Sequence, residues 1–425
     1  MAYTTLQTPR GTKDFLPRDA RRKRWMEDTL LGLFGLWNYG EIITPTMEYH
    51  DAVCAGGATG LADNLYRFFE KEGELIALKP DATTPVARVV ASRLKDEPKP
   101  IRLCYSTNVF RYGETHAQRR REFYQIGVEL VGQGGYIADA EIIALAVQAL
   151  QAVGLRDFRI DIGHVDYYDG ILQHSTLSHN ERRQIRGALL KKDYVALSQM
   201  LNSSGLDPAQ RRLLKLLPDL RGGEDTLDEA LDLATNPVSK KAVTDLIAIY
   251  NALKAYGLDG WVQVDLGMIK DIQYYTGMVL EAYTSEMGFT LGTGGRYDNL
   301  ISQFGYQCPA TGFALGVDRV MLALSRQGSW PPEGAVPVLC GINGHDLQLG
   351  WQVAETIRQK GHRVEMDVAI RDREELTEYA KAIGFDWVIL PISPGKLRYW
   401  HIDKGWQEGE LAKLLDLLGG GENYG

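Results

Sequence analysis

Cysteine is scarce in this sequence, and the cysteines are spread along the chain without CxxC spacing or a Cys/His pattern. They are Cys54, Cys104, Cys308 and Cys340. A disulfide framework and a metal site are therefore not expected, and a reducing compartment is the simpler interpretation. The N-terminus has no apolar signal core, and no later stretch reaches the run of about 18 apolar residues that spans a membrane. We therefore expect a cytoplasmic protein with no membrane segment, no metal and no cofactor.

Positive charge is also in deficit. Lysine and arginine number 47 against 55 aspartates and glutamates, which gives a formal net charge of −8. This balance argues against a general surface for binding polyanions such as nucleic acids. A local basic patch remains open as an alternative, and the run of arginines at 119–121 is one candidate.

The chain is too long, at 425 residues, for one compact core, so two or three domains are expected. Residues 1–330 alternate strand and helix patterns and predict an α+β body, with a helical insertion at about 178–256. The stretch "GSWPPEGAVP" is rich in proline and glycine and predicts a linker that ends at 331–335. Residues 336–425 then predict a small α/β domain.

A polar loop between two predicted strands is the first segment that can carry chemistry. It reads "FRYGETHAQRRREFYQ", with Arg111 at a strand end and Arg119 and Arg121 further along. Guanidinium groups offer planar, two-pronged donors to carboxylate or phosphate, so this loop could fold over a nucleotide. The alternative is a solvated hairpin tip.

Two later segments are also candidates. "GTGGRYDNLISQFGYQCPATGFALGVDRVM" begins with a predicted glycine-rich turn and ends with Arg319 opening a helix, either facing a pocket or in a structural ion pair. "MIKDIQYYTG" carries Lys270 and two adjacent tyrosines, Tyr274 and Tyr275. If these tyrosines lie on a strand, they point to opposite faces, and only one can line a given pocket. Simple packing is the alternative for these two tyrosines.

The order of these segments resembles the three motifs of the class II aminoacyl-tRNA synthetases. "LKPDATTPVARVVA", "REFYQIGVELVG", "QYYTGMVLEAY" and "GGRYDNL" are similar to the histidyl-tRNA synthetase lineage. The resemblance covers roughly residues 8–325 and is weaker in the C-terminal domain. It implies a class II synthetase-like fold, α+β, with an antiparallel sheet, flanking helices and a small C-terminal α/β domain.

That lineage contains the synthetases and a paralogue, the regulatory subunit of the short-form ATP phosphoribosyltransferase. In the arginine loop, Gly113, Glu114, Thr115, His116 and Gln118 depart from the synthetase pattern. An acidic side chain at 114, where the synthetases have an arginine, works against binding phosphates. The regulatory-subunit pattern fits better, because "LKPDATTPVAR", "REFYQIGVELVG" and "PATGFALGVDR" are similar to that family across the body.

A lysine–aspartate pair, Lys270 and Asp271, occupies the positions at which the synthetase pattern has an arginine followed by a glycine. Lysine keeps the charge but lacks the forked geometry that can hold a carboxylate and a phosphate oxygen together. We therefore interpret Lys270 as the remnant of a lost catalytic function, and we expect no catalytic residue in this chain.

The C-terminal domain gives an independent test. From Val336 to the end there are ten Lys and Arg against fourteen Asp and Glu, a net charge of −4. The synthetase pattern has a lysine-rich segment at the position where this chain has "REELTEYA". A module that binds tRNA should present lysine and arginine to the phosphates. We therefore expect a degenerate anticodon-binding domain and no tRNA partner, although many regulatory subunits resemble a synthetase that lacks this domain altogether.

The resemblance implies a histidine site. Asp81 and Glu129 would pair with the α-ammonium or the imidazole, Gln125 would hydrogen-bond the ligand, and Arg111 or Lys270 would meet the carboxylate. Tyr274 or Tyr275 would pack beside the imidazole ring of the histidine. The residues implied to bind histidine are Asp81, Arg111, Gln125, Glu129, Lys270, Tyr274 and Tyr275. The alternative is that histidine binds at the contact with the catalytic chain.

Three arginines are the implied vestigial contacts for a nucleotide or another anion: Arg119, Arg121 and Arg319. As a whole, the sequence predicts a non-catalytic regulatory subunit for the first step of histidine biosynthesis. Its expected partner is the short-form catalytic subunit, with a homodimer inside a hetero-octamer implied by the family. The alternatives are an active histidine–tRNA ligase and another paralogue that senses amino acids or modifies a different substrate.

Overall fold

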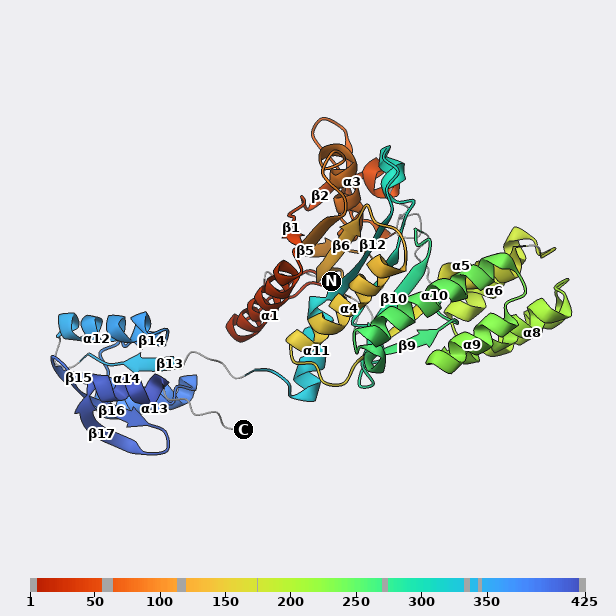
Figure 1. The fold of residues 1–425 in the computed structure, drawn as a ribbon. Helices are drawn as coiled ribbons and strands as arrows, with labels where there is room; N and C mark the ends of the chain where they lie inside the picture. Colours follow the sequence, from red (N-terminus) through yellow and green to blue (C-terminus); the bar gives the residue numbers. More distant parts are fainter. Residues whose placement is uncertain are drawn as a thin grey trace. The chain divides into compact units, whose positions relative to one another are not determined.

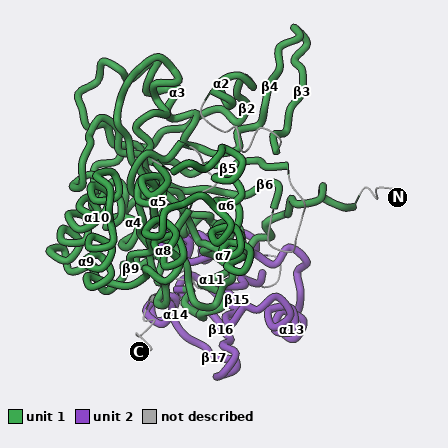
Figure 2. Tube along the Cα trace, turned by 90° about the vertical axis from the view of Figure 1, so that its right-hand side faces the viewer, with its two compact units in different colours: residues 1–330 green, residues 331–425 purple. Residues whose placement is uncertain are grey.

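The computed structural model divides into two compact units, Met1–Trp330 and Pro331–Gly425, which Figure 2 colours separately. The residues that it describes are 6–55, 64–112, 120–173, 175–269, 274–331, 337–342 and 346–419. Among these residues, none of the helices is both long and apolar enough to span a membrane.

A mixed sheet forms the centre of the first unit, with the strand order β1-β5-β6-β12-β11-β10-β7-β9-β8 among the described residues. Its pairs are antiparallel except β1 with β5 and β7 with β9, which are parallel. Its strands are β1 Gly40–Glu41, β5 Ile101–Phe110, β6 Glu122–Val131, β7 Arg159–His164, β8 Arg221–Gly222, β9 Val262–Asp265, β10 Met278–Tyr283, β11 Gly292–Arg296 and β12 Ala310–Gly316. A smaller sheet consists of β2 Met47–Tyr49, β4 Leu75–Leu78 and β3 Arg67–Phe69, in this order.

Helices cover the large sheet and flank the smaller one. They are α1 Pro17–Leu36, α2 His50–Ala55, α3 Thr83–Arg93, α4 Tyr136–Ala152, α5 Val165–Leu172 and α11 Val317–Gln327. Helix α4 is buried on nearly all sides because it packs on β6 and β12 and lies between α1 and α10, as Figure 1 shows. Its sequence, "YIADAEIIALAVQALQA", is accordingly apolar around most of its circumference. The α+β expectation is confirmed.

Five helices form the segment that the sequence predicts as a helical insertion. They are α6 His179–Leu190, α7 Tyr194–Ser203, α8 Pro208–Leu216, α9 Glu224–Leu233 and α10 Pro237–Ala255. Capping boxes start two of them, with Ser178 before α6 and Asp207 before α8. The segment is not separate from the body, because α10 packs on α4, α5 and β7, and β8 pairs with β9 at the edge of the large sheet.

The second unit contains a mixed sheet in the order β14-β13-β15-β16-β17. Its elements are β13 Pro337–Cys340, α12 Leu347–Gln359, β14 Arg363–Met366, α13 Arg373–Ile383, β15 Trp387–Ser393, β16 Lys396–His401, β17 Gly405–Glu410 and α14 Leu411–Gly419. The first five follow the predicted alternation of strand and helix. The antiparallel hairpin of β16 and β17 was not predicted from the sequence.

Two local predictions are wrong. The glycine-rich stretch at 292–296 is not a turn but strand β11, between β10 and β12. Its glycines bring the backbones close, since a Cβ on Gly294 would lie 2.4 Å from the carbonyl oxygen of Gly312. Tyr274 and Tyr275 do not lie on a strand, because β10 begins only at Met278. The alternation of strand side chains therefore does not apply to these tyrosines.

Candidate functional site

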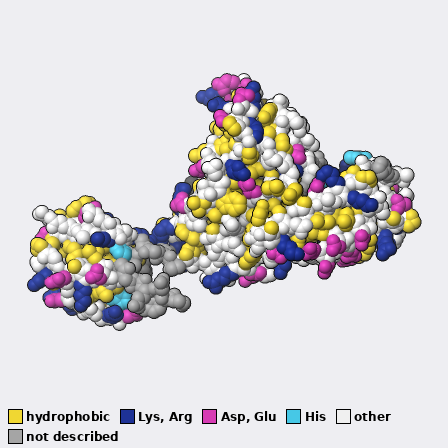
Figure 3. Space-filling view, in the orientation of Figure 1, with side chains coloured by type: hydrophobic (Ala, Val, Ile, Leu, Met, Phe, Trp, Pro, Cys, Tyr) yellow, Lys and Arg dark blue, Asp and Glu magenta, His cyan; other side chains and the backbone are white. Residues whose placement is uncertain are grey.

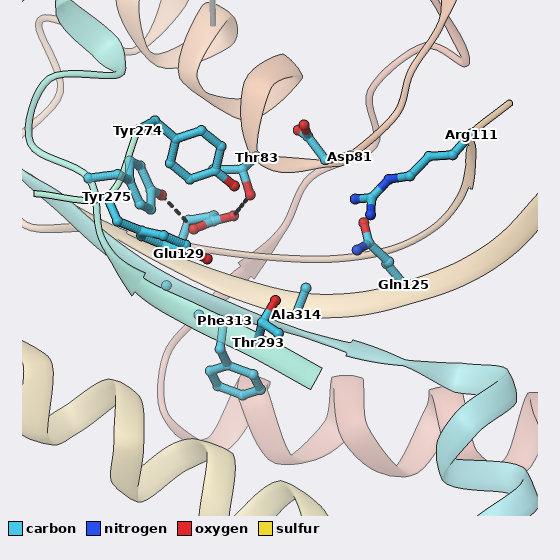
Figure 4. A pocket seen from close by; sticks show the side chains of 13 residues that line it. Asp81, Thr83, Arg111, Gln125, Glu129, Tyr274, Tyr275, Thr293, Phe313 and Ala314 are labelled. Carbon is cyan, nitrogen blue, oxygen red and sulfur yellow. Dashed lines mark hydrogen bonds between the residues drawn. The ribbon is translucent and has the colours of Figure 1, made fainter. Parts of the chain in front are cut away.

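A pocket opens where β6, β11 and β12 pass beneath the start of α3. It encloses about 390 Å³ of empty space, its open mouth included. Six of the seven residues implied to bind histidine are described by the structure, and all six line this pocket (Figure 4). Among the described residues, the lining consists of Asp81, Thr83, Arg111, Gln125, Glu129, Tyr274, Tyr275, Thr293, Gly294, Tyr297, Gly312, Phe313 and Ala314.

Strand β6 provides the floor of the pocket with two polar side chains. Gln125 and Glu129 are four residues apart, so the two-residue period of a strand places both on the same face. Gly312 of β12 is the partner of Glu129 in the ladder. A Cβ on Gly312 would lie 1.9 Å from Glu129 Oε2, so the carboxylate occupies the space that any larger residue would need.

Glu129 is the most deeply buried acid of the site, with a relative exposure of 1%. It accepts hydrogen bonds from the hydroxyls of Thr83 at 2.8 Å, Tyr105 at 3.3 Å and Tyr297 at 2.5 Å. Burial raises the pKa of Glu129 from 4.5 to about 7, against the opposing effect of these hydrogen bonds. The carboxyl can therefore gain or lose a proton near neutral pH.

Tyrosines wall the pocket beside Glu129. The ring centroids of Tyr274 and Tyr275 are 5.0 Å apart, and those of Tyr274 and Tyr297 are 6.0 Å apart, both in edge-to-face contact. Burial raises the pKa of all three hydroxyls above the ordinary tyrosine value. They therefore remain protonated and can donate hydrogen bonds. Both Tyr274 and Tyr275 line the pocket, contrary to the expectation that only one could.

A second carboxylate comes from the segment that leads into α3. Asp81 is buried and accepts a hydrogen bond from the backbone N–H of Thr84 at 2.8 Å. Arg111 follows β5, and its Nε donates to the carbonyl of Pro80 at 2.8 Å. Figure 4 shows Glu129 and the tyrosines at one end of the pocket, Arg111 with Gln125 at the other, and Asp81 between them. Opposite charges are thus separated along the pocket.

Gln125 presents a buried acceptor in the pocket. Its Oε1 is buried and has no hydrogen-bond partner among the residues that the structure describes. Leaving such a group unpaired costs about 1–3 kcal/mol, so buried acceptors of this kind usually meet a donor. The pocket is therefore suited to a ligand that donates a hydrogen bond beside Gln125.

The remaining predicted residues lie elsewhere. Arg319 does not line the pocket: it donates to the carbonyl of Thr290 at 2.7 Å, and its guanidinium lies over the ring of Phe289. Arg121 also lies outside the lining, with its guanidinium 4.6 Å from the ring centroid of Tyr112. Arg119 and Lys270 fall outside the described residues.

Sequence reasoning missed several residues of the site. Thr83, Thr293 and Tyr297 line the pocket, and Tyr105 supports Glu129 from β5. Thr83 and Tyr297 lie inside the motifs "LKPDATTPVARVVA" and "GGRYDNL". Their position in these motifs was a usable signal, but only the fold shows that their hydroxyls meet at one carboxylate.

Comparisons with known proteins agree on one lineage. The family model described as Histidyl-tRNA synthetase matches residues 11–320. The chain is 42% identical to the ATP phosphoribosyltransferase regulatory subunit of Moorella thermoacetica, over 90% of this chain and 98% of that protein. It is 34% identical to the subunit of the same name from Acetivibrio thermocellus, over 97% of this chain and 98% of that one.

Solved structures show the same fold. A Bacillus halodurans protein described as an ATP phosphoribosyltransferase regulatory subunit/histidyl-tRNA synthetase matches with a TM-score of 0.81 and 32% identity, over 92% of this chain and 100% of that one. The histidyl-tRNA synthetase from Nostoc sp. PCC 7120 matches with a TM-score of 0.83 and 22% identity, over 98% of this chain and 99% of that one. At that identity the second match shows the fold alone. The chain therefore belongs to the ATP phosphoribosyltransferase regulatory subunit family and has the class II fold of the histidyl-tRNA synthetases.

Proposed function

We propose that this chain binds histidine in the pocket of Figure 4 and controls a separate, short-form catalytic subunit of ATP phosphoribosyltransferase without catalysing a reaction itself. In this function, histidine is the end product that reports on its own biosynthesis. The family membership supports the regulatory role, and the pocket supports histidine as the effector.

The order of charges along the pocket is the observation that carries the proposal. Histidine has a cationic ammonium and an anionic carboxylate at one end and an imidazole at the other. Glu129 with its tyrosine wall suits the imidazole, Asp81 suits the ammonium, and Arg111 suits the carboxylate. The Oε1 of Gln125, which has no partner in the part of the chain that the structure describes, would accept a hydrogen bond from the ammonium.

Two features support a role without amino-acid activation. Forming an adenylate needs cations that hold the nucleotide phosphates and stabilise charge that develops in the transition state. Here the guanidinium of Arg319 is directed to the carbonyl of Thr290, and the stretch at 270–271 lacks the forked cation of the synthetases. Both features favour a pocket for the amino acid over a site for its activation.

Surface charge supports the absence of a tRNA partner. Helix α9 carries a group of exposed acidic residues, and Figure 3 shows acidic side chains gathered over this helix. They are Glu224, Asp225, Asp228, Glu229 and Asp232. Such a surface repels a phosphate backbone, as does the net charge of −4 in residues 336–425.

Regulation would follow from linkage between histidine and the assembled complex. A ligand that prefers one arrangement of a complex shifts its population by the difference in affinity, and typical couplings are ~1–3 kcal/mol. We propose a homodimer of this chain within a hetero-octamer, located in the cytoplasm, as the form in which this coupling operates.

Histidine titration calorimetry and inhibition of the assembled complex test the proposal together. Gln125→Ala and Tyr275→Ala should each weaken histidine binding to the chain and raise the histidine concentration needed for inhibition. Gln352→Ala, at an exposed position of α12 in the second unit, is the matched control and should change neither. Unchanged inhibition with both pocket variants would exclude this pocket as the effector site.

A further inference from the structure

Lys79 is a buried cation that the proposed site does not use directly. Its relative exposure is 1%, and its Nζ donates to the carbonyl of Thr44 at 3.1 Å and lies 3.4 Å from the Thr44 hydroxyl. Burial lowers its pKa, while the charge of Glu48 raises it. Glu48 itself is held by Arg88 through two hydrogen bonds of 2.8 Å. Among the described residues, no ion pair of Lys79 is formed.

Both the main chain and the side chain of Lys79 attach to the same stretch, residues 44–46. Its backbone N–H donates to the carbonyl of Thr46 at 3.0 Å, which extends the antiparallel pairing of β2 and β4 by one step. Its Nζ then returns to Thr44. This stretch therefore fixes Lys79 at two points, one of which requires a long side chain that ends in N–H donors.

On its other side, the segment 79–81 holds two residues of the pocket. The carbonyl of Lys79 accepts from the backbone N–H of Phe110 at 2.9 Å. The carbonyl of Pro80 accepts from Arg111 Nε at 2.8 Å, which directs that guanidinium. Asp81 is the next residue and lines the pocket. A shift of this segment would therefore displace Asp81 and Arg111 together.

The buried ammonium of Lys79 is not expected to stabilise the fold. Removing an ammonium from water costs several kcal/mol unless good partners offset it, and an apolar side chain of similar volume is often neutral or stabilising. Methionine would leave no unpaired buried charge at this position, because Glu48 keeps Arg88. The half-buried Thr44 could then meet water.

We propose that Lys79 is a positioning residue for histidine: it fixes the segment 79–81 on residues 44–46 and so sets the places of Asp81 and Arg111. This inference rests on the proposed function, since it concerns affinity for the ligand assigned there. It assigns Lys79 no contact with histidine. Its effect is on the positions of the Asp81 and Arg111 side chains in the pocket before histidine binds.

Calorimetric titration of the full chain with histidine tests this role. Lys79→Met should weaken histidine binding about tenfold, because the hydrogen bond from Lys79 to Thr44 that places Asp81 and Arg111 is lost. The unfolding midpoint should not fall. Lys79→Arg, which restores a cation with N–H donors, should recover most of the affinity. Arg88→Met breaks the ion pair with Glu48 and does not touch the segment 79–81, so it should lower the midpoint and leave the affinity unchanged.

Equal affinity of wild type and Lys79→Met would overturn the inference while leaving the proposed function intact. Absence of histidine binding in the wild type would instead defeat the proposed function. If Lys79→Met does not fold, Lys79→Leu also lacks the N–H donor and allows the same comparison. Wild-type affinity in that folded variant, or loss of affinity only in proportion to loss of stability, would also overturn the positioning role.

Discussion

Replacing Glu129 by glutamine should remove a pH-dependent loss of stability from the chain without histidine. The carboxyl is 1% exposed, and its pKa is raised by burial from 4.5 to about 7. One pKa unit corresponds to about 1.4 kcal/mol. The difference between the two values therefore corresponds to about 3 kcal/mol, the additional free energy needed to ionise this group in the folded protein compared with the unfolded chain.

The direction of this pH effect depends on whether the folded or the unfolded chain binds the proton of Glu129 more tightly. Below pH 4.5 the carboxyl is protonated in both states, so it imposes no penalty. Between pH 4.5 and about 7 the unfolded chain loses this proton while the folded chain keeps it. The free energy of unfolding therefore falls as the pH rises through this window, and the loss is complete above it. Glu129→Gln cannot ionise and should show no such loss.

Urea unfolding from pH 5 to 8 without histidine measures this effect. The free energy of unfolding of Glu129→Gln minus that of wild type should rise across this range by up to about 3 kcal/mol. The pKa of Asp161 at about 6 and that of His164 at about 4 add pH dependence to both proteins and cancel in the difference. Glu229→Gln, at an exposed position of α9, is the control for losing one carboxylate. A difference that stays constant over the range would refute the reasoning.

Three further changes have defined outcomes. Gly312→Ala should abolish histidine binding in calorimetry, because its Cβ would lie 1.9 Å from the carboxylate of Glu129. Gly288→Ala should bind normally, because its Cβ would meet no described residue beyond its chain neighbours within 4 Å. Arg319→Ala should lower the free energy of unfolding by ~1–2 kcal/mol in urea titration and leave histidine affinity unchanged, since its hydrogen bond is structural. His164 caps α5 with a pKa lowered by burial from 6.5 to about 4, so stability should fall as the pH falls through this window. His164→Asn, which can cap without titrating, should lack that loss in acid unfolding; equal loss in both would contradict this reasoning.

The pocket lining was largely predictable because it depends on residues in recognisable motifs. Asp81, Arg111, Gln125 and Glu129 come from segments that are similar to a known lineage, and strand period alone puts Gln125 and Glu129 on one face. The body likewise follows from the alternation of helix and strand patterns. Here local sequence and tertiary structure agree.

Contacts between strands that are far apart in the sequence could not be predicted from the sequence. The glycines of 292–296 suggested a turn, but their absent side chains instead allow β11 to pass closely between its neighbours. Tyr274 and Tyr275 share one pocket because β10 starts later than the apolar pattern indicates. The direction of Arg319 depends on Thr290, which becomes its neighbour only after the chain has folded.

Histidine-dependent exchange of pyrophosphate into ATP, measured with the purified chain at a histidine concentration that saturates the pocket, tests the central claim most directly. We expect the pocket to be occupied and the exchange to stay at the level seen without histidine. Robust exchange would mean that the pocket activates the amino acid, and the chain would then be a histidine–tRNA ligase.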